Sequence, residues 1–244
     1  MNSVTLTGMV LTAMPIGEYD KRLVILTKER GKITAFAKGA RKQNSALLAC
    51  SQPFSFGDFT LYEGRSSYSV QNADIKNYFV ELREQFESVY FGLYFCEFAD
   101  YLTRENVNET AILKLLYQSL RVLVKNTIPY DLIRYIFELK IVALSGEAPQ
   151  VFECVKCKKT EDLKFFSSQS GGLVCNSCGM QANDKIVLSG STIYTMQYIL
   201  TSSIEKLYTF TVSPQVLEEL KKCMTRYKQQ YIDKQFKTLE MLEI

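Results

Sequence analysis

Two pairs of cysteines have the spacing that most directly predicts chemistry in this sequence. Cys154 and Cys157 form the first pair, Cys175 and Cys178 form the second, and seventeen residues separate the pairs. This spacing is typical of four-thiolate zinc sites, because a two-residue gap lets a tight turn aim both thiolates at one ion. Gly179 follows the second pair, and we expect it to supply the backbone freedom that closes this turn.

The cysteine set predicts Zn²⁺ in a structural role, since four protein thiolates leave no coordination position open for water. A disulfide is disfavoured in a reducing compartment, and a redox Cys-x-x-Cys motif requires one pair beside a βαβ unit. An iron–sulfur cluster and a metal-free site remain alternatives. Strand-like pieces at 163–166 and 171–174 predict a zinc ribbon, and three lysines are placed to offset the thiolate charge: Lys156, Lys158 and Lys159. We expect the remaining cysteines to be small buried residues: Cys50, Cys96 and Cys223.

The sequence contains no histidine, and this excludes several classes of enzyme. Ser-His-Asp hydrolases, HExxH metalloproteases, His-ligated zinc deaminases and any imidazole general base all require that side chain. The sequence also lacks a phosphate-binding Gly-x-x-x-x-Gly-Lys loop, a lysine nucleophile motif and a convincing carboxylate cluster. These absences argue against an enzyme.

Positive charge is concentrated in residues 21–42. This segment has eight Lys or Arg residues and one acidic residue, a net charge of +7; the whole chain carries +3, so the remainder carries −4. Phe36 and Lys38 fall on the same side of a predicted strand, and the basic loop 38–42 contains Gly39. Aromatic rings beside cations are typical of surfaces that bind single-stranded nucleic acid, although barrel core is the alternative for most aromatic residues here.

The elements that must position these residues differ between the two parts of the chain. Apolar residues alternate with polar ones in five short runs before Tyr78, and turn residues separate the runs at intervals of about ten residues, which predicts a small closed barrel. From Phe86 onward the apolar period is that of helices. We expect helices after the N-cap Asn108, from Asp131 to Leu144, and after the helix starts Ser191 and Ser213-Pro214.

Length and composition agree with a globular chain of about two domains. The chain has 244 residues, of which 47% are hydrophobic and 23% charged. The uncharged start lacks the basic region of a signal peptide, and no apolar run approaches the ~18 residues of a membrane span. We therefore expect a cytoplasmic protein whose cysteines are reduced.

Several ordered motifs closely resemble the bacterial RecO family of recombination mediators. They are GEYDKRLVILT at 17–27, ERGKITAFAKGARK at 29–42, QPF at 52–54, LYEGR at 61–65, FEL at 137–139, GEAP at 146–149, and the four cysteines. The resemblance spans nearly the whole chain. It implies an α+β protein, with an N-terminal OB-fold β-barrel at 1–80 and an all-α domain at 81–244 that carries the four-cysteine zinc ribbon at 151–183.

The resemblance also implies a function without catalysis. Members of this family bind single- and double-stranded DNA, anneal complementary strands, associate with RecR, and help RecA replace the single-strand-binding protein, whose C-terminal tail is a further partner. Such a protein acts at the nucleoid. Together with the basic segment, the resemblance predicts these DNA-binding residues: Lys21, Arg22, Phe36, Lys38, Arg41 and Lys42. Some members lack the cysteines, which agrees with a structural role for zinc.

Two other classes of function remain as alternatives. A nucleic-acid-processing enzyme would show cleavage that depends on a divalent metal. A zinc-ribbon adaptor in transcription would bind mainly protein, and single-stranded DNA would not retain it at low or high salt.

Overall fold

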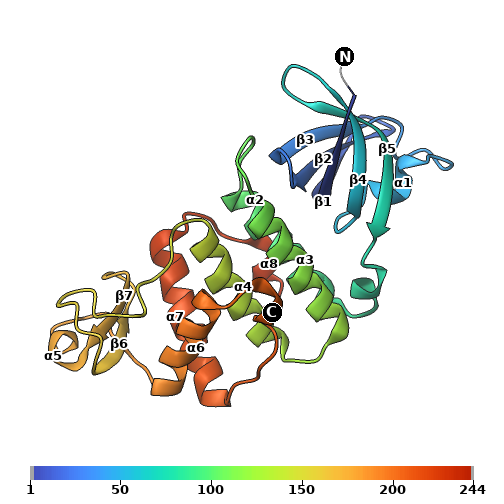
Figure 1. Cartoon of the computed structure of the whole chain (residues 1–244). Helices are drawn as coiled ribbons and strands as arrows, with labels where there is room; N and C mark the ends of the chain where they lie inside the picture. The colour runs from blue at the N-terminus through green and yellow to red at the C-terminus, as the bar shows by residue number, and fades with distance from the viewer. Residues whose placement is uncertain (1–2, 243–244) are drawn as a thin grey trace. The chain divides into compact units, whose positions relative to one another are not determined.

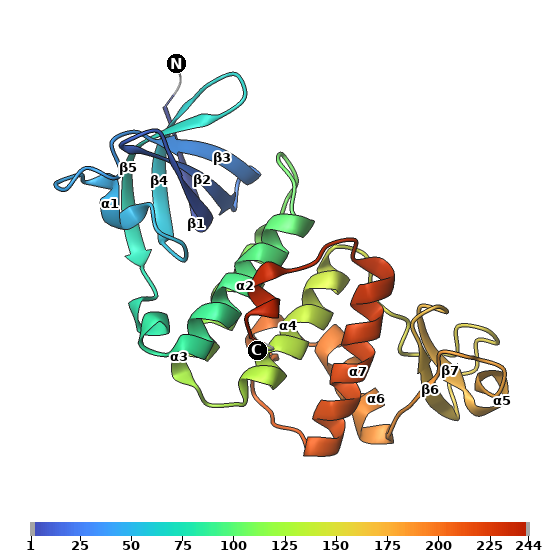
Figure 2. The same ribbon diagram turned by 180° about the vertical axis from the view of Figure 1, so that it is seen from behind.

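A computed structural model describes residues 3–242, which fall into two compact units (Figures 1 and 2). The first unit comprises the chain up to Lys125 together with the residues from Phe236 onward, and the second comprises Asn126–Gln235. The first unit contains a β-barrel and helices, and the second contains helices and a small sheet.

Five strands close into the barrel expected from the period-two pattern. They are β1 (Ser3–Ile16), β2 (Asp20–Thr27), β3 (Gly31–Ala37), β4 (Phe56–Glu63) and β5 (Tyr68–Asn77), in the closed order β1-β2-β3-β5-β4. All neighbours are antiparallel except β3 and β5, which close the barrel through two parallel pairs, Ala35 with Tyr68 and Phe36 with Ser69. The prediction of an N-terminal OB-like barrel is confirmed.

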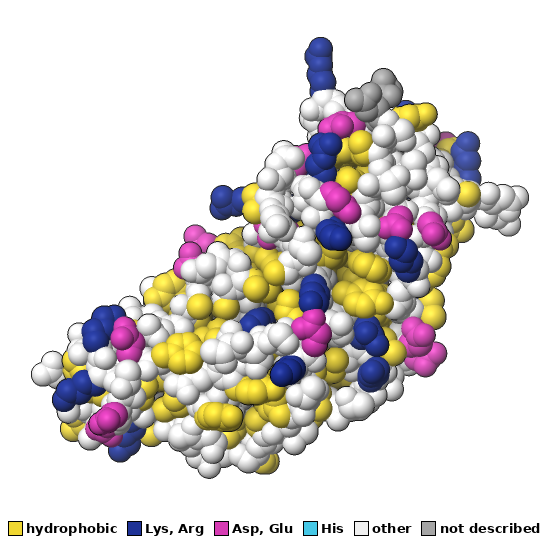
Figure 3. Space-filling view, viewed as in Figure 1, with side chains coloured by type: hydrophobic (Ala, Val, Ile, Leu, Met, Phe, Trp, Pro, Cys, Tyr) yellow, Lys and Arg dark blue, Asp and Glu magenta, His cyan; other side chains and the backbone are white. Residues whose placement is uncertain are grey.

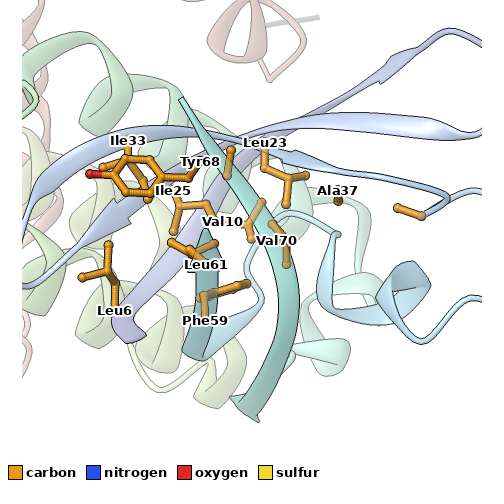
Figure 4. Close-up of a cluster of buried hydrophobic side chains, with 12 residues drawn as sticks. Leu6, Val10, Leu23, Ile25, Ile33, Ala37, Phe59, Leu61, Tyr68 and Val70 are labelled. Carbon is orange, nitrogen blue, oxygen red and sulfur yellow. The ribbon is translucent and has the colours of Figure 1, made fainter. Parts of the chain in front are cut away.

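The barrel interior is filled by alternate residues of all five strands. Figure 4 shows these side chains converging: Leu6, Val10, Leu23, Ile25, Ile33, Ala37, Phe59, Leu61, Tyr68 and Val70. Most of them are completely buried, including Leu23, Ile25 and Phe59. Because successive side chains of a strand point to opposite faces, the residues between them form the outer surface of the barrel.

Helices complete the first unit. A short helix α1 (Leu47–Cys50) follows β3, and after β5 come the 3₁₀ helix η1 (Val80–Glu84), α2 (Phe86–Leu102) and α3 (Thr110–Lys125). The Asn108 side chain accepts a hydrogen bond from the Thr110 backbone N–H at the start of α3, near the position expected for the cap. The C-terminal helix α8 (Lys237–Glu240) packs on α2, where Phe236 is buried against Tyr94 and Phe98.

The second unit is built on α4 (Tyr130–Leu144), which contacts α6 (Gly190–Thr201) and α7 (Pro214–Tyr231). The 3₁₀ helix η2 (Ile204–Lys206) follows α6. Ser213 caps α7 and Pro214 occupies its first turn, as expected, but the cap of α6 is Ser189 rather than Ser191. The Ser189 side chain accepts the Thr192 N–H, and the carboxylate of Glu219 holds Ser189 in place.

Three charged residues of α4 are buried, an outcome that the apolar pattern does not indicate. Glu138 is fully buried, and its Oε1 accepts hydrogen bonds from Arg134 of the same helix and Lys228 of α7. The Lys140 ammonium donates to the carbonyls of Ile199, Leu200 and Ser202, and so caps the C-terminal end of α6.

Among the described residues, no helix combines the length and apolar character that crossing a membrane would need.

A small sheet in the second unit lies between α4 and α6 in sequence. Its strands are β6 (Leu163–Ser167), β7 (Gly172–Cys175) and β8 (Ile186–Val187), in the order β7-β6-β8, and the short helix α5 (Asn176–Gly179) follows β7. The antiparallel β6–β7 hairpin is the structure expected between the two cysteine pairs.

Candidate metal centre and nucleic-acid interface

The β6–β7 hairpin and the turns beside it bring the two cysteine pairs together. The first pair lies in a turn that is closed by hydrogen bonds from Lys158 N to Cys154 O and from Cys154 N to Lys159 O. Lys158 adopts the left-handed region in this turn, with φ of 64°. The second pair spans the end of β7 and the short helix α5. Cys154 and Cys175 are buried, and Cys157 is exposed.

The four sulfur atoms lie close enough together to bind one metal ion. They all lie within 4.8 Å of one another, and the Sγ atoms of Cys157 and Cys175 are 3.6 Å apart. Zinc–sulfur bonds of about 2.3 Å in a tetrahedron place neighbouring sulfurs about 3.8 Å apart. Four thiolates at this spacing form a possible metal-binding site with no coordination position left for substrate.

The protein already favours ionisation of one of these thiols. Burial of Cys154 opposes its ionisation, but backbone N–H groups of Cys175, Cys157 and Lys156 donate to its sulfur and lower its pKa to about 6. Hydrogen bonding with Cys157 and Cys175 instead raises the pKa of Cys178 to about 12. Cys154 and Cys178 therefore differ in how readily they lose a proton, and a bound cation would favour the thiolate form of both.

Gly179 is needed beside the second pair for a different reason from the one expected. Its backbone has no positive φ, so the proposed role in closing the turn is wrong. A Cβ atom at this position would lie 2.1 Å from Cδ2 of Phe165, whose ring packs directly on the α5 backbone. The close approach of an aromatic ring, rather than a special turn, requires glycine here.

The three lysines expected to offset the thiolate charge differ in their partners. Lys156, Lys158 and Lys159 are all exposed, but Lys158 pairs with Glu153 at 2.8 Å. Basic and acidic side chains lie close together around this sheet in Figure 3. The three remaining cysteines are buried as predicted, and burial raises the pKa of Cys50, Cys96 and Cys223.

The structure divides the basic segment into one buried cation, two cations in partly exposed ion pairs, and cations that face solvent. Lys21 is buried, with 8% of its surface exposed, and its Nζ donates to Ser51 O at 3.0 Å. It therefore does not lie at the surface with the other predicted DNA-binding residues. Arg30 pairs with Glu63 at 2.9 Å, and Lys32 pairs with Asp100 at 3.0 Å. Lys21 is therefore an internal cation, whereas Arg30 and Lys32 are partly exposed and held in ion pairs.

The other cations of the segment face solvent. Arg22, Lys28, Lys38, Arg41 and Lys42 are exposed, and Phe36 is half-buried on the outer face of β3. Figure 3 shows Lys and Arg side chains projecting from the barrel surface. The structure thus brings Arg22, Phe36 and Lys38 to the outside of β2 and β3, next to the loop that carries Arg41 and Lys42.

The basic loop is held in shape by the β1–β2 turn. Gly39, at a φ of 68°, donates its N–H to the Asp20 carboxylate at 2.7 Å, and the Arg41 N–H donates to Tyr19 O. The Lys42 ammonium lies 5.4 Å from the centre of the Tyr19 ring. Sequence reasoning missed Asp20 and Tyr19 as supports of this loop, because a contact between two turns has no sequence period.

Comparison with known proteins gives full-length matches. The family model described as "Recombination protein O N terminal" matches residues 1–79, and "Recombination protein O C terminal" matches residues 83–240. Relatives named DNA repair protein RecO include one from Alkaliphilus metalliredigens, 36% identical over 96% of this chain and 96% of the relative. The relative from Acetivibrio thermocellus is 30% identical over 100% of this chain and 97% of its own length. The relative from Caldicellulosiruptor saccharolyticus is 31% identical over 100% of this chain and 99% of its own length.

Proposed function

Because this chain belongs to the RecO family of DNA repair proteins, we propose that it is a recombination mediator that acts without catalysing a reaction. It binds single- and double-stranded DNA and anneals complementary strands. With RecR, it promotes loading of RecA onto DNA that is coated by the single-strand-binding protein, whose C-terminal tail it contacts.

The observation that carries this proposal is the set of solvent-facing cations around Phe36. Arg22, Lys38, Arg41 and Lys42 are exposed on one part of the barrel, and Asp20 and Tyr19 hold the loop that carries three of them. Phosphate contacts release condensed counterions, which makes binding favourable at low salt. A cationic surface that holds two strands also lowers their mutual repulsion, and complementary bases can then pair.

A salt titration of single-stranded DNA binding tests this proposal. Replacing Lys38, Arg41 and Lys42 by alanine should weaken binding and reduce the slope of log K against log salt by about 2, at about 0.7 per phosphate contact. The matched control replaces three exposed lysines of the other unit, Lys206, Lys221 and Lys222, and should keep the slope. An unchanged slope in the barrel variant would place the DNA elsewhere, and no retention of the unaltered protein at low salt would favour a protein-binding adaptor.

We further propose that the four-cysteine site holds structural Zn²⁺. The 3.6 Å between the sulfurs of Cys157 and Cys175 is close to the spacing in tetrahedral zinc–thiolate sites, and four thiolates would complete the coordination of the ion. The site would stabilise the β6–β7 hairpin and the turns beside it, where Val174, Val155 and Leu163 pack against the cysteines.

A further inference from the structure

Strand register places a row of four side chains side by side on the outside of the barrel. Arg22 of β2 pairs with Phe36 of β3, Phe36 pairs with Ser69 of β5, and Ser69 pairs with Tyr62 of β4. Paired residues of neighbouring strands project from the same face. Tyr62 is 40% exposed, and Phe36 is half-buried. Two aromatic side chains therefore flank a serine on the barrel surface.

The small side chain of Ser69 leaves a hollow between the two rings. This hollow has a volume of about 240 Å³ and is lined by Phe36, Lys38, Tyr62, Ser69 and the β4–β5 turn. Residues two strands apart are separated by about 9.6 Å at the backbone. A flat base about 3.4 Å thick, placed between two rings, needs about 6.8 Å between the ring planes. The backbone separation therefore exceeds the spacing that one base needs between two rings.

The charges around the hollow suit a nucleotide. Lys38 is exposed and lines one side, and Arg22 is the neighbour of Phe36 in the row. The acidic residue at the hollow, Glu63, is neutralised by Arg30 at 2.9 Å. A volume of about 240 Å³ is below the roughly 300–1,000 Å³ of pockets that hold drug-sized ligands, which favours a single flat ring.

We propose that the hollow between Phe36 and Tyr62 receives one unstacked base of single-stranded DNA, with a flanking phosphate on Lys38. This inference rests on the proposed DNA-binding function and adds Tyr62 to the residues that contact the strand. Stacking on rings accepts any base, because every base has a π-face. A base held in the hollow would be unstacked from its neighbours in the same strand, and its pairing edge could then meet a complementary strand.

Binding of oligothymidylate, compared with binding of an equally long abasic strand, tests the hollow. The unaltered protein should bind the base-bearing strand more tightly. Tyr62→Ala should lose about 5- to 150-fold in affinity for that strand and little for the abasic strand, since stacking is lost but phosphate contacts remain. Tyr62→Phe should retain the affinity. Tyr78→Ala is the matched control, because Tyr78 has a similar exposure, 39%, and does not line the hollow.

A second variant separates loss of the ring from loss of the fold. Ser69→Met fills the hollow without removing a charge or an aromatic ring, and it should reduce affinity for the base-bearing strand in the same way. If Tyr62→Ala and Ser69→Met both bind oligothymidylate like the unaltered protein, with the same salt slope, the hollow is not a base site, although the proposed function stands. Failure of the unaltered protein to bind either strand would overturn both.

Discussion

The ammonium group of Lys21 donates a hydrogen bond to the backbone carbonyl of Ser51 at 3.0 Å and is buried inside the first unit. Burial lowers the pKa of Lys21, since it penalises the charged form. The next residue, Arg22, is exposed on the opposite face of the same strand. Adjacent basic residues therefore have different roles: one ties β2 to the segment after α1, and the other faces solvent.

Lys21→Met should reduce stability without changing phosphate contacts. The Ser51 carbonyl loses a charged donor, which should cost about 1–3 kcal/mol of unfolding free energy in urea. The salt slope of single-stranded DNA binding should stay constant, whereas Lys38→Ala should lower it by about 0.7. A reduced slope with unchanged stability would show instead that Lys21 reaches phosphate.

Removal of metal should destabilise the second unit before it affects DNA binding. Chelation, or Cys157→Ser, should lower the melting temperature, because ion binding contributes directly to folding of small thiolate sites. Binding of single-stranded DNA by the barrel should persist below the new melting temperature. Loss of DNA binding while circular dichroism reports an intact fold would contradict a purely structural role for the metal ion. Measurement of the zinc content per chain identifies the ion.

Gly179→Ala should damage the cysteine site through the Phe165 ring. The new Cβ would overlap Cδ2 of Phe165, so the ring or α5 must shift, at a cost of about 1–3 kcal/mol. We expect weaker zinc retention against a competing chelator, and partial rescue by adding Phe165→Leu. Gly190→Ala is the matched control, since a Cβ there meets no atom within 4 Å. Equal zinc retention by the two variants would refute the steric explanation.

Glu219→Gln should remove a pH-dependent part of the stability. Partial burial opposes ionisation of Glu219, but hydrogen bonds from Thr192 and Ser189 outweigh it and lower the pKa. A carboxylate with a depressed folded-state pKa stabilises fully above its unfolded pKa of about 4.3, and this contribution disappears as pH falls through the lower folded value. The variant should be about 1–2 kcal/mol less stable at pH 7, with the gap closing below about pH 4. A gap that is constant with pH would indicate lost packing instead.

Phe236→Ala should destabilise the first unit by about 3 kcal/mol, as expected for a buried aromatic side chain. The Phe236 ring packs edge-on against Tyr94, with 5.3 Å between the ring centroids, and it also contacts Phe98, with 4.7 Å between the ring centroids. Met241→Ala, at an exposed position of the same C-terminal segment, should change stability by less than about 0.5 kcal/mol. Urea unfolding compares the two, and similar small effects would show that the segment does not stabilise α2.

Local patterns predicted most elements of the fold. Alternation of apolar residues predicts the barrel strands because each strand has one buried face. The spacing of the four cysteines predicts that they lie close together, because this spacing is typical of sites in which four thiolates bind one ion. Ser213-Pro214 marks the start of α7 through capping chemistry that needs no distant partner. Ser191 was two residues away from the true cap, since Glu219, from another helix, holds Ser189.

The sequence by itself determined that this protein has a small barrel, helices, a thiolate cluster and a strongly basic segment. The tertiary structure alone decided which cations have a partner within the first unit: Lys21, Arg30 and Lys32 each meet a group at least thirty residues away, and of the three only Lys21 is buried. It also decided that Gly179 accommodates the Phe165 ring, and that Phe36, Ser69 and Tyr62 form one row. These relationships depend on strand register and packing between distant segments, which local periodicity does not encode.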